Sequence, residues 1–455
     1  MVAVRELTGS LYVITHARPP SSRVLLLVGA VVLIALAAGG VVTAGRSGEV
    51  PAAPEPPALL AAAGGPAAGT RIAPAAATAP GDLSLQLQAL LGQHSILAAD
   101  MMRGRLRDDP DLAQAANAAL GRNTDAMGKL VAAEFGSRAA QAFTPLWSSH
   151  VTALFNYSRG LADGDAGVTG QATTAVTRIE KELAVFFAGA SQGRLTPAAA
   201  LSAVTTHITH LLDQADRYAA GDYAGSDRAY RAAFAHAFEL GRALAGALLP
   251  PAATKVLGTP AWRLRSALSQ LLGEHAALAV AAMRAGATDA PDFRAAANSI
   301  NGNTTDLTAA VDVLFGPRAA GSFQTMWADH IDLLVRYAAA VAKGDDGAGT
   351  RITSGLNGFE RKLATFLSTA TGDTVAAAGL AGALQSHDTM LRRQVDAYVA
   401  KDYRASHDIA YSTYQEMVGL AGQLSDAFGV EVASRLPAGA PQTGRGGMAP
   451  AVGRR

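Results

Sequence analysis

Six histidines recur at near-constant spacing in this chain, and this repetition constrains the fold more than any other feature of the sequence. They form two groups of three: His94, His150 and His207, followed by His275, His330 and His387. Neighbours within a group are 55 to 57 residues apart, and the two groups are offset by 180 or 181 residues. Such a period is typical of a helical hairpin, so the pattern indicates one hairpin copied to three and the trio then duplicated.

The two halves also align in blocks around the histidines. LLGQHSILAADMMR at 90–103 matches LLGEHAALAVAAMR at 271–284, and FGSRAAQAFTPLWSSH at 135–150 matches FGPRAAGSFQTMWADH at 315–330. The copies are separated by PPAATKVLGTP, whose prolines at both edges predict a domain boundary. We therefore expect a first bundle over 82–250, a linker over 251–260 and a second bundle over 261–430.

Each half is predicted to be all-α, an up-down bundle of six helices that form three helical hairpins. No stretch has the periodicity of a strand, and Gly, Asp and Pro interrupt the helical pattern at intervals of roughly 20–27 residues. Apolar positions recur at alternating spacings of four and three, as at Phe143, Trp147 and His150, which is typical of a bundle seam. The histidines therefore belong to the apolar faces of their helices.

The first, third and fifth helices of an up-down bundle run in the same direction. From expected helix starts at Asp82, Ser137 and Thr196, the three histidines of the first half lie 12, 13 and 11 residues in. At about 1.5 Å per residue, this places them within about 3 Å of one level along the bundle axis. Three imidazoles can therefore share one layer if the three helices are neighbours.

A layer of three neutral imidazoles is a candidate transition-metal site, because imidazole is the commonest ligand for these ions and a fourth donor would complete the coordination. Fourth-donor candidates are His210, which is matched by Met390 in the second half, Met102, which is matched by Met283, and His236. Histidine and methionine donors without cysteine favour copper, ahead of zinc, iron or a b-type haem. The hypothetical metal ligands are thus His94, His150, His207, His210, His236, His275, His330, His387 and Met390.

A purely structural role for the histidines competes with metal binding. A duplicated hairpin inherits its core histidines, and a buried neutral imidazole that is bonded to a carbonyl or an aspartate needs no metal. Other recurrent residues also have structural explanations. Asp165 and Asp222 follow tight turns and are expected to cap helices. Glu180 and Glu360 are expected on solvated helix faces.

Composition and motif content exclude several classes of function. The net charge is +1, from 38 basic and 37 acidic residues, without a basic cluster before the extreme C-terminus, so nucleic-acid binding is not expected. Cysteine is absent, which excludes disulfides, thiolate metal sites and covalent CxxCH haem attachment. The sequence contains no Walker loop, dinucleotide fingerprint, nucleophile elbow or paired Glu-x-x-His, so enzymatic activity is not expected.

The N-terminal region predicts attachment to a membrane. Residues 24–44 are a run of 21 residues without a charge, long enough to span the hydrocarbon core as one helix. Three arginines precede this run, which predicts a cytoplasmic segment over 1–23 and an extracytoplasmic location for the bulk of the chain. A cleaved signal peptide and a secreted product are the alternative. An Ala/Pro-rich linker is expected over 45–81 and a disordered tail over 431–455.

WxxH at 147–150 and 327–330, followed by GDY at 221–223 and KDY at 401–403, resembles the repeats of poorly characterised bacterial secreted or membrane-anchored helical proteins. The resemblance covers residues 83–429 and implies tandem helical repeats without an established activity. The sequence therefore predicts a membrane-anchored, extracytoplasmic binding module that holds a transition metal, with copper favoured. The alternative is a non-catalytic envelope scaffold or sensor domain, with purely structural histidines, that contacts a protein partner of the cell envelope.

Overall fold

The computed structural model describes residues 80–434, and this part of the chain is all-α as predicted. It contains thirteen α-helices and one short 3-10 helix, and no strand occurs within residues 80–434. The expected membrane segment at 24–44 lies outside the described residues, as do the expected cytoplasmic segment and most of the expected linker and tail. Among the helices that are described, none combines the length and the apolar character needed to cross a membrane.

Each half folds as six long helices. In the first half they are α4 (Pro80–Leu106), α5 (Pro110–Phe135), α6 (Ser137–Asp163), α7 (Ala166–Ala190), α8 (Pro197–Ala219) and α9 (Tyr223–Leu248). In the second half they are α11 (Pro260–Ala287), α12 (Phe293–Phe315), α13 (Pro317–Ala342), α14 (Asp346–Ala370), α15 (Ala377–Val399) and α16 (Tyr403–Ser434). The predicted linker contains α10 (Pro251–Thr254) and the 3-10 helix η2 (Lys255–Gly258).

Several helices begin at acidic residues that cap them, as the sequence predicted. The Asp165 carboxylate accepts hydrogen bonds from two backbone amides in the first turn of α7, and Asp222 accepts one in the first turn of α9. Asp345 and Asp402 cap α14 and α16 in the same way. Each carboxylate satisfies amides that have no partner within the helix, and it thereby sets the residue at which the helix starts. Gly164, just before one of these caps, has a φ of 64°, in the left-handed region that favours glycine.

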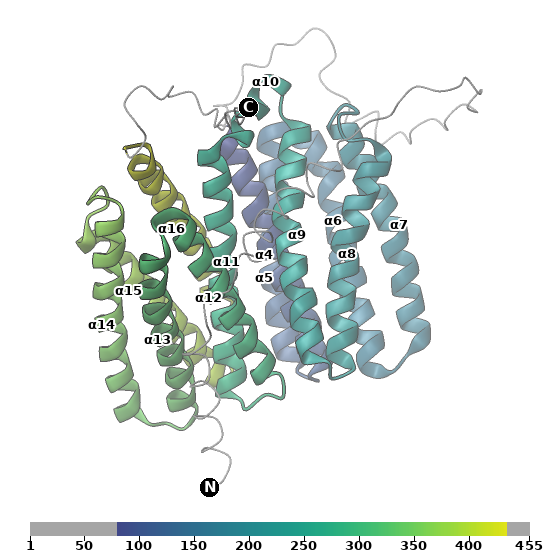
Figure 1. The fold of residues 1–455 in the computed structure, drawn as a ribbon. Coiled ribbons are helices and arrows are strands. Elements are labelled where there is room, and N and C mark those ends of the chain that lie inside the picture. The colour runs from purple at the N-terminus through teal and green to yellow at the C-terminus, as the bar shows by residue number, and fades with distance from the viewer. Residues whose placement is uncertain (1–79, 435–455) are drawn as a thin grey trace, which may run out of the picture. The chain divides into compact units, whose positions relative to one another are not determined.

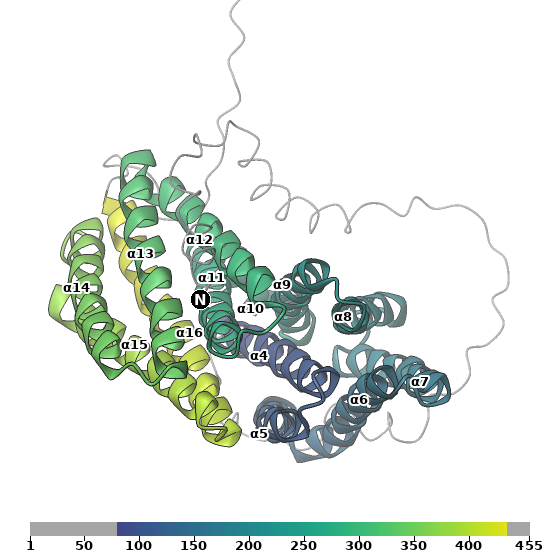
Figure 2. The same cartoon turned by 90° about the horizontal axis from the view of Figure 1, so that it is seen from below.

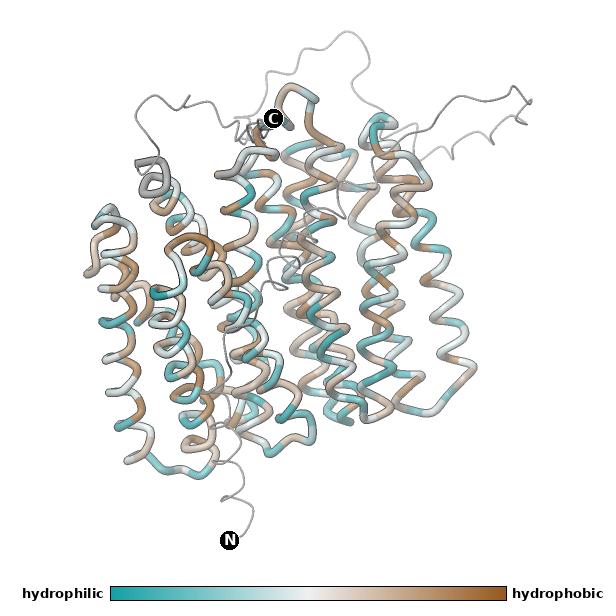
Figure 3. Tube along the Cα trace, viewed as in Figure 1, coloured by the Kyte–Doolittle hydropathy of each residue, from teal (hydrophilic) through white to brown (hydrophobic). Residues whose placement is uncertain are grey.

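One helix in each half is central to its bundle. Helix α4 contacts α5, α6, α8 and α9, and α11 contacts α12, α13, α15 and α16. The helices of a half run side by side (Figure 1), and the view along their axes shows α4 between α5 and α9 (Figure 2). Apolar residues, brown in Figure 3, alternate with polar ones along each helix. Helices α6 and α8 also contact each other, so the three histidine-bearing helices of the first half are mutual neighbours.

The two halves pack against each other through both apolar and charged side chains. Helix α4 contacts α11, α5 contacts α16 and α9 contacts α12, and both halves belong to the same compact unit. Arg107 donates to Asp292 at 2.5 Å, and Arg231 donates to both carboxylate oxygens of Glu274 at 2.9 and 3.0 Å. Independent folding of each half, which the duplication suggests, stays a prediction, and it would require these charged groups to face water.

A buried arginine recurs at the equivalent position of both central helices. Arg103 on α4 donates to the amide oxygen of Gln214, the hydroxyl of Ser226 and the carboxylate of Asp227, at 3.1, 3.0 and 2.8 Å. Its counterpart Arg284 on α11 repeats the glutamine and serine bonds and reaches across to Asp100 of the first half at 3.2 Å. The core accepts each guanidinium because its N–H groups are bonded and its charge is paired.

Replacing Arg103 by Met should destabilise the protein by about 3–5 kcal/mol, because Asp227 would stay buried without its charge partner. Urea unfolding of the full-length protein, monitored by circular dichroism, measures this decrease in the free energy of unfolding. The matched control is Arg178→Met, since Arg178 pairs with Glu182 on an exposed helix surface and its loss should cost at most about 0.5 kcal/mol. Equal unfolding free energies for the two variants would contradict the importance of the buried pair.

Candidate metal centre

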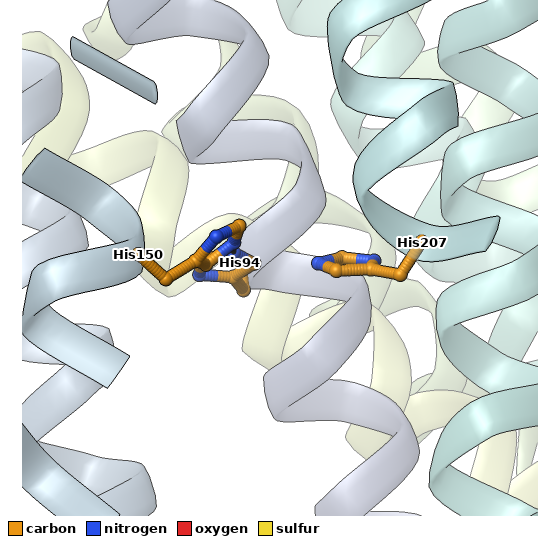
Figure 4. Close-up of side chains that lie close together, drawn as sticks. All are labelled: His94, His150 and His207. Atoms are coloured by element: carbon orange, nitrogen blue, oxygen red, sulfur yellow. Dashed lines mark hydrogen bonds between the residues drawn. The ribbon is translucent and has the colours of Figure 1, made fainter. Parts of the chain in front are cut away.

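The three histidines of the first half converge on one point in the core. His94 extends from α4, His150 from α6 and His207 from α8, and their side chains point toward one another (Figure 4). One nitrogen from each ring lies within 4.8 Å of the other two. The equivalent residues of α11, α13 and α15 converge in the same way. We call His94, His150 and His207 the first triad, and His275, His330 and His387 the second triad.

Distances in the first triad suit an ion with nitrogen ligands. The Nε2 atoms of His94 and His150 are 3.3 Å apart, and the ring of His207 lies 5.5 and 5.8 Å from theirs, centre to centre. Two nitrogens bound to one ion at about 2.0 Å are about 3.3 Å apart in tetrahedral geometry and about 3.5 Å apart in trigonal geometry. One pair of nitrogens therefore has the separation expected of two ligands of one ion. A ring nitrogen of His207 can be the third ligand.

Most ring nitrogens of the two triads have no partner within the protein. All six side chains are at most 2% exposed, and nine of their twelve nitrogens lack a hydrogen-bond partner among residues 80–434. Both nitrogens of His207, His275 and His387 are in this state. A buried polar atom that is left unpaired costs about 1–3 kcal/mol, and most such atoms in native proteins are paired. The two triads are therefore clusters of donor atoms that the surrounding protein does not satisfy.

Burial keeps the triads uncharged at neutral pH. It lowers the pKa of His150 and of His387 to about 4, and it brings the pKa of His94 and of His207 well below their usual range. The rings of a triad reinforce this effect, because charge on one ring opposes charge on the next. A neutral imidazole has the free lone pair that a metal requires, so no proton has to leave before an ion binds.

A tryptophan lies against each triad. The ring centre of Trp147, one turn before His150 on α6, is 4.7 Å from that of His94 and 5.4 Å from that of His150. Trp327 lies at the same 4.7 Å from His275. Both indoles are at most 4% exposed. The WxxH spacing therefore places an imidazole and an apolar wall on the same helix face, and the wall keeps water from the nitrogens.

The second triad has a carboxyl neighbour that the first triad lacks. Asp388 Oδ1 lies 3.7 Å from Nδ1 of His330, and Asp388 is 1% exposed. Burial and the neighbouring carboxyl of Glu360 raise the pKa of Asp388 well above its usual range. The equivalent residue of the first half is Ile208. The sequence analysis missed Asp388, although its place next to the triad residue His387 was an available signal.

Glu360 is buried, so the prediction that it lies on a solvated face was wrong. Its side chain is 4% exposed and lies near the carboxyl of Asp388, and burial raises its pKa. Its counterpart Glu180 is half-buried and accepts a hydrogen bond from Thr205 at 3.2 Å. A glutamate at the edge of an apolar face can turn either to solvent or to the core, and a buried partner decides which.

The sulfurs of Met102 and Met283, two of the methionines considered as fourth donors, contact glutamine amides. Met102 Sδ accepts a hydrogen bond from the Gln214 amide at 3.7 Å, and Met283 Sδ accepts one from Gln394 at 3.9 Å. Each sulfur belongs to a residue two helical turns past the triad histidine of its helix, about 12 Å along the axis. Met390 is half-buried on α15, one turn after His387, and stays a predicted ligand.

His210 and His236 form a separate pair next to the first triad. Both are half-buried, and their ring centres are 5.8 Å apart. They are not among the nitrogens that converge within 4.8 Å. The pair lies next to the triad, because His210 is one turn after His207 on α8 and His236 contacts the carbonyl of Ala203, one turn before His207.

The free energy of unfolding of the metal-free protein should fall as the pH decreases from 8 to 5. The pKa of a triad histidine is lowered in the folded state but close to 6.5 in the unfolded chain, so the unfolded chain binds more protons in this range. The stabilisation is therefore complete above pH 6.5 and is lost as the pH falls toward 4. For His150 the loss at pH 5 is about 2 kcal/mol.

His150→Gln isolates this contribution, because glutamine does not titrate. Urea unfolding at pH 8 and pH 5 should show that the variant loses about 2 kcal/mol less than the wild-type protein. An equal loss in the two proteins would show that His150 is not held neutral by the fold.

Comparisons with known proteins leave the two triads to be interpreted from their own geometry. No family model, curated protein or solved structure matches the chain. The function is therefore inferred from the chemistry of these side chains.

Proposed function

We propose that each half of the protein binds one transition-metal ion through its triad, and that the protein is a binding module rather than an enzyme. The observation that carries this proposal is the set of buried ring nitrogens, of which nine in twelve have no partner among the described residues. In each half the three rings come from three different helices, and one nitrogen of each ring lies within 4.8 Å of the other two. An ion bound by three of them would occupy lone pairs that the protein itself leaves unused.

Copper is the favoured ion. For nitrogen ligands, the affinity of divalent first-row ions is highest for Cu(II). In the first triad, however, no carboxylate of the described chain contributes to the pKa of any of the three rings. The cost of desolvating an ion grows with the square of its charge, so a monovalent ion is buried at about a quarter of the cost of a divalent one. Cu(I) therefore suits the neutral first triad better than zinc or divalent iron.

The second triad also has a carboxyl group that can hold one of its histidine ligands in place. Histidines that bind metals usually interact through their other ring nitrogen with a carboxylate or a carbonyl, which fixes the ring orientation. Asp388 lies on the Nδ1 side of His330, which leaves Nε2 of His330 for the ion. The second triad therefore has a carboxyl group that the first triad lacks. If this carboxyl releases its proton when the ion binds, its negative charge would offset part of the ionic charge, so the second triad should accept an ion of higher charge more readily.

The proposal includes a location outside the cytoplasm. The uncharged run at 24–44 would hold the protein in the cell membrane as a single span, with both bundles on the extracytoplasmic side. A secreted product, after cleavage of the same segment, is the alternative. This part of the proposal is supported by the sequence alone.

One contact favours a second candidate function, an envelope scaffold or sensor domain with structural histidines that binds another envelope protein. The Nε2 atoms of His94 and His150, 3.3 Å apart, can share a proton in an N–H···N hydrogen bond. That bond would satisfy two rings of the first triad without a metal. It leaves both nitrogens of His207 unpaired, so metal binding accounts for more of the triad.

Full-length protein that is loaded with Cu(I) and then desalted should retain two copper ions per chain. His150→Ala and His330→Ala should each retain one, and the double variant none, because loss of one of three ligands opens the site. Elemental analysis measures the copper content. His407→Gln is the matched control, because His407 is as buried as the triad histidines but lies outside both triads, and this variant should retain two. Two ions retained by the double variant would place the copper elsewhere.

Cu(I) should also raise the melting temperature of the wild-type protein. An ion that binds only the folded state stabilises it by RT ln(1 + [L]/Kd), which is about 4 kcal/mol at a thousandfold excess over Kd. The His150→Ala, His330→Ala double variant should melt at the same temperature with and without the ion. If copper, zinc and iron all leave the wild-type melting temperature unchanged, the scaffold interpretation is the better one.

A further inference from the structure

Both triads are sealed from solvent, so an ion must cross part of the bundle to reach them. Each triad side chain is at most 2% exposed. An ion that crossed an apolar interior would lose its hydration shell without gaining other ligands. This desolvation costs free energy even for a singly charged ion. Side chains that can bind the ion on the way would lower this barrier.

Two such side chains lie beside the first triad. His210 is one turn after His207 on α8, and its ring centre is 5.8 Å from that of His236 on α9. Ring centres within the first triad are 5.3 to 5.8 Å apart, so the outer pair has the same spacing. The Nε2 of His236 lies 3.0 Å from the carbonyl oxygen of Ala203, which accepts its proton and leaves Nδ1 with a free lone pair.

The pair connects solvent with the triad. His210 and His236 are half-buried, whereas His207 is 2% exposed. His210 lies three residues after His207 on α8, and the Ala203 carbonyl that contacts His236 lies four residues before His207, so both outer rings are next to His207. Within the first triad, His207 is therefore the ring that an ion bound at the pair would meet first.

We infer that His210 and His236 form an outer metal site that captures Cu(I) at the surface and passes it to the first triad through His207. This inference rests on the proposed function. Along this path the ion exchanges one imidazole for the next and keeps nitrogen ligands throughout. Only metal–nitrogen bonds form and break, and the receiving rings are neutral, so no proton has to be displaced.

The second half has no equivalent pair of imidazoles. Met390 and Glu416 occupy the positions of His210 and His236. Glu416 is half-buried and hydrogen bonds with Ser386, and burial raises its pKa. The proposed path is therefore specific to the first triad, and the second triad provides a control within the same chain.

The test compares the rate of Cu(I) uptake by each triad in the full-length protein. His330→Ala leaves the first triad as the only complete one, and His150→Ala leaves the second. In each background the outer pair is replaced by His210→Gln and His236→Gln. Glutamine keeps an amide donor for the Ala203 carbonyl but provides no imidazole, so the local fold is preserved, which circular dichroism and the melting temperature verify.

Uptake is followed under anaerobic, reducing conditions by the quenching of tryptophan fluorescence, because Trp147 and Trp327 lie directly against the triads. The Kd is obtained separately by competition with the Cu(I) chelator bicinchoninate. We expect the glutamine variants to slow uptake by the first triad at least tenfold and to change its Kd less than threefold. Uptake by the second triad should be unchanged.

Three results would overturn the path. Unchanged uptake by the first triad would show that the ion enters elsewhere. A Kd that rises in parallel with the loss of rate would show that the pair supplies ligands to the final site instead of delivering the ion. Equal slowing at both triads would show a general effect of the substitutions. A parent protein that binds no Cu(I) would instead refute the proposed function, and with it this path.

Discussion

Burying three neutral imidazoles at one level of a helical bundle is the constraint on which the rest of this structure depends. The rings can be buried because the interior lowers their pKa, and they can meet because their helices are neighbours. Their nitrogens then remain polar atoms in an apolar setting, where a partner is worth more than in water. The tryptophan at the WxxH motif keeps water out of the same space. The triads therefore combine buried donor nitrogens with aromatic side chains that exclude the water to which these nitrogens would otherwise hydrogen bond.

The central helices connect the triads to the rest of the fold. Helix α4 carries a triad histidine in its middle and, two and a half turns later, the buried Arg103, and α11 repeats both features with His275 and Arg284. Each arginine binds a glutamine and a serine of its own half. Arg284 also reaches Asp100 on α4, so the two central helices are joined by a charged contact. The level of a triad along its bundle is thus fixed partly by polar contacts away from the histidines, including contacts with the other half.

The two halves keep the triads while their surroundings differ. The first half has an outer histidine pair, and the apolar Ile208 follows His207. The second half has Asp388 and Glu360 buried at the equivalent place, and a phenylalanine ring stacked on His330 at 4.2 Å. Such surroundings affect which ion a nitrogen site can hold, because a carboxyl that loses its proton can offset an ionic charge and a neutral imidazole cannot. The two halves therefore present the same three histidines in different electrostatic environments.

The sequence by itself determined the all-α class, the six helices of each half, their capped starts and the common level of the triad histidines. Periodicity contains this information because it reports which face of a helix is apolar and how far along the helix a residue lies. It does not report which helices are neighbours or which way a residue at the edge of an apolar face turns. Only the tertiary structure decided that the histidines converge, that Met102 bonds to a glutamine on another helix, that Glu360 is buried, and that charged pairs such as Arg107 with Asp292 join the halves. These outcomes depend on contacts between residues far apart in the chain, for which helical spacing provides no measure.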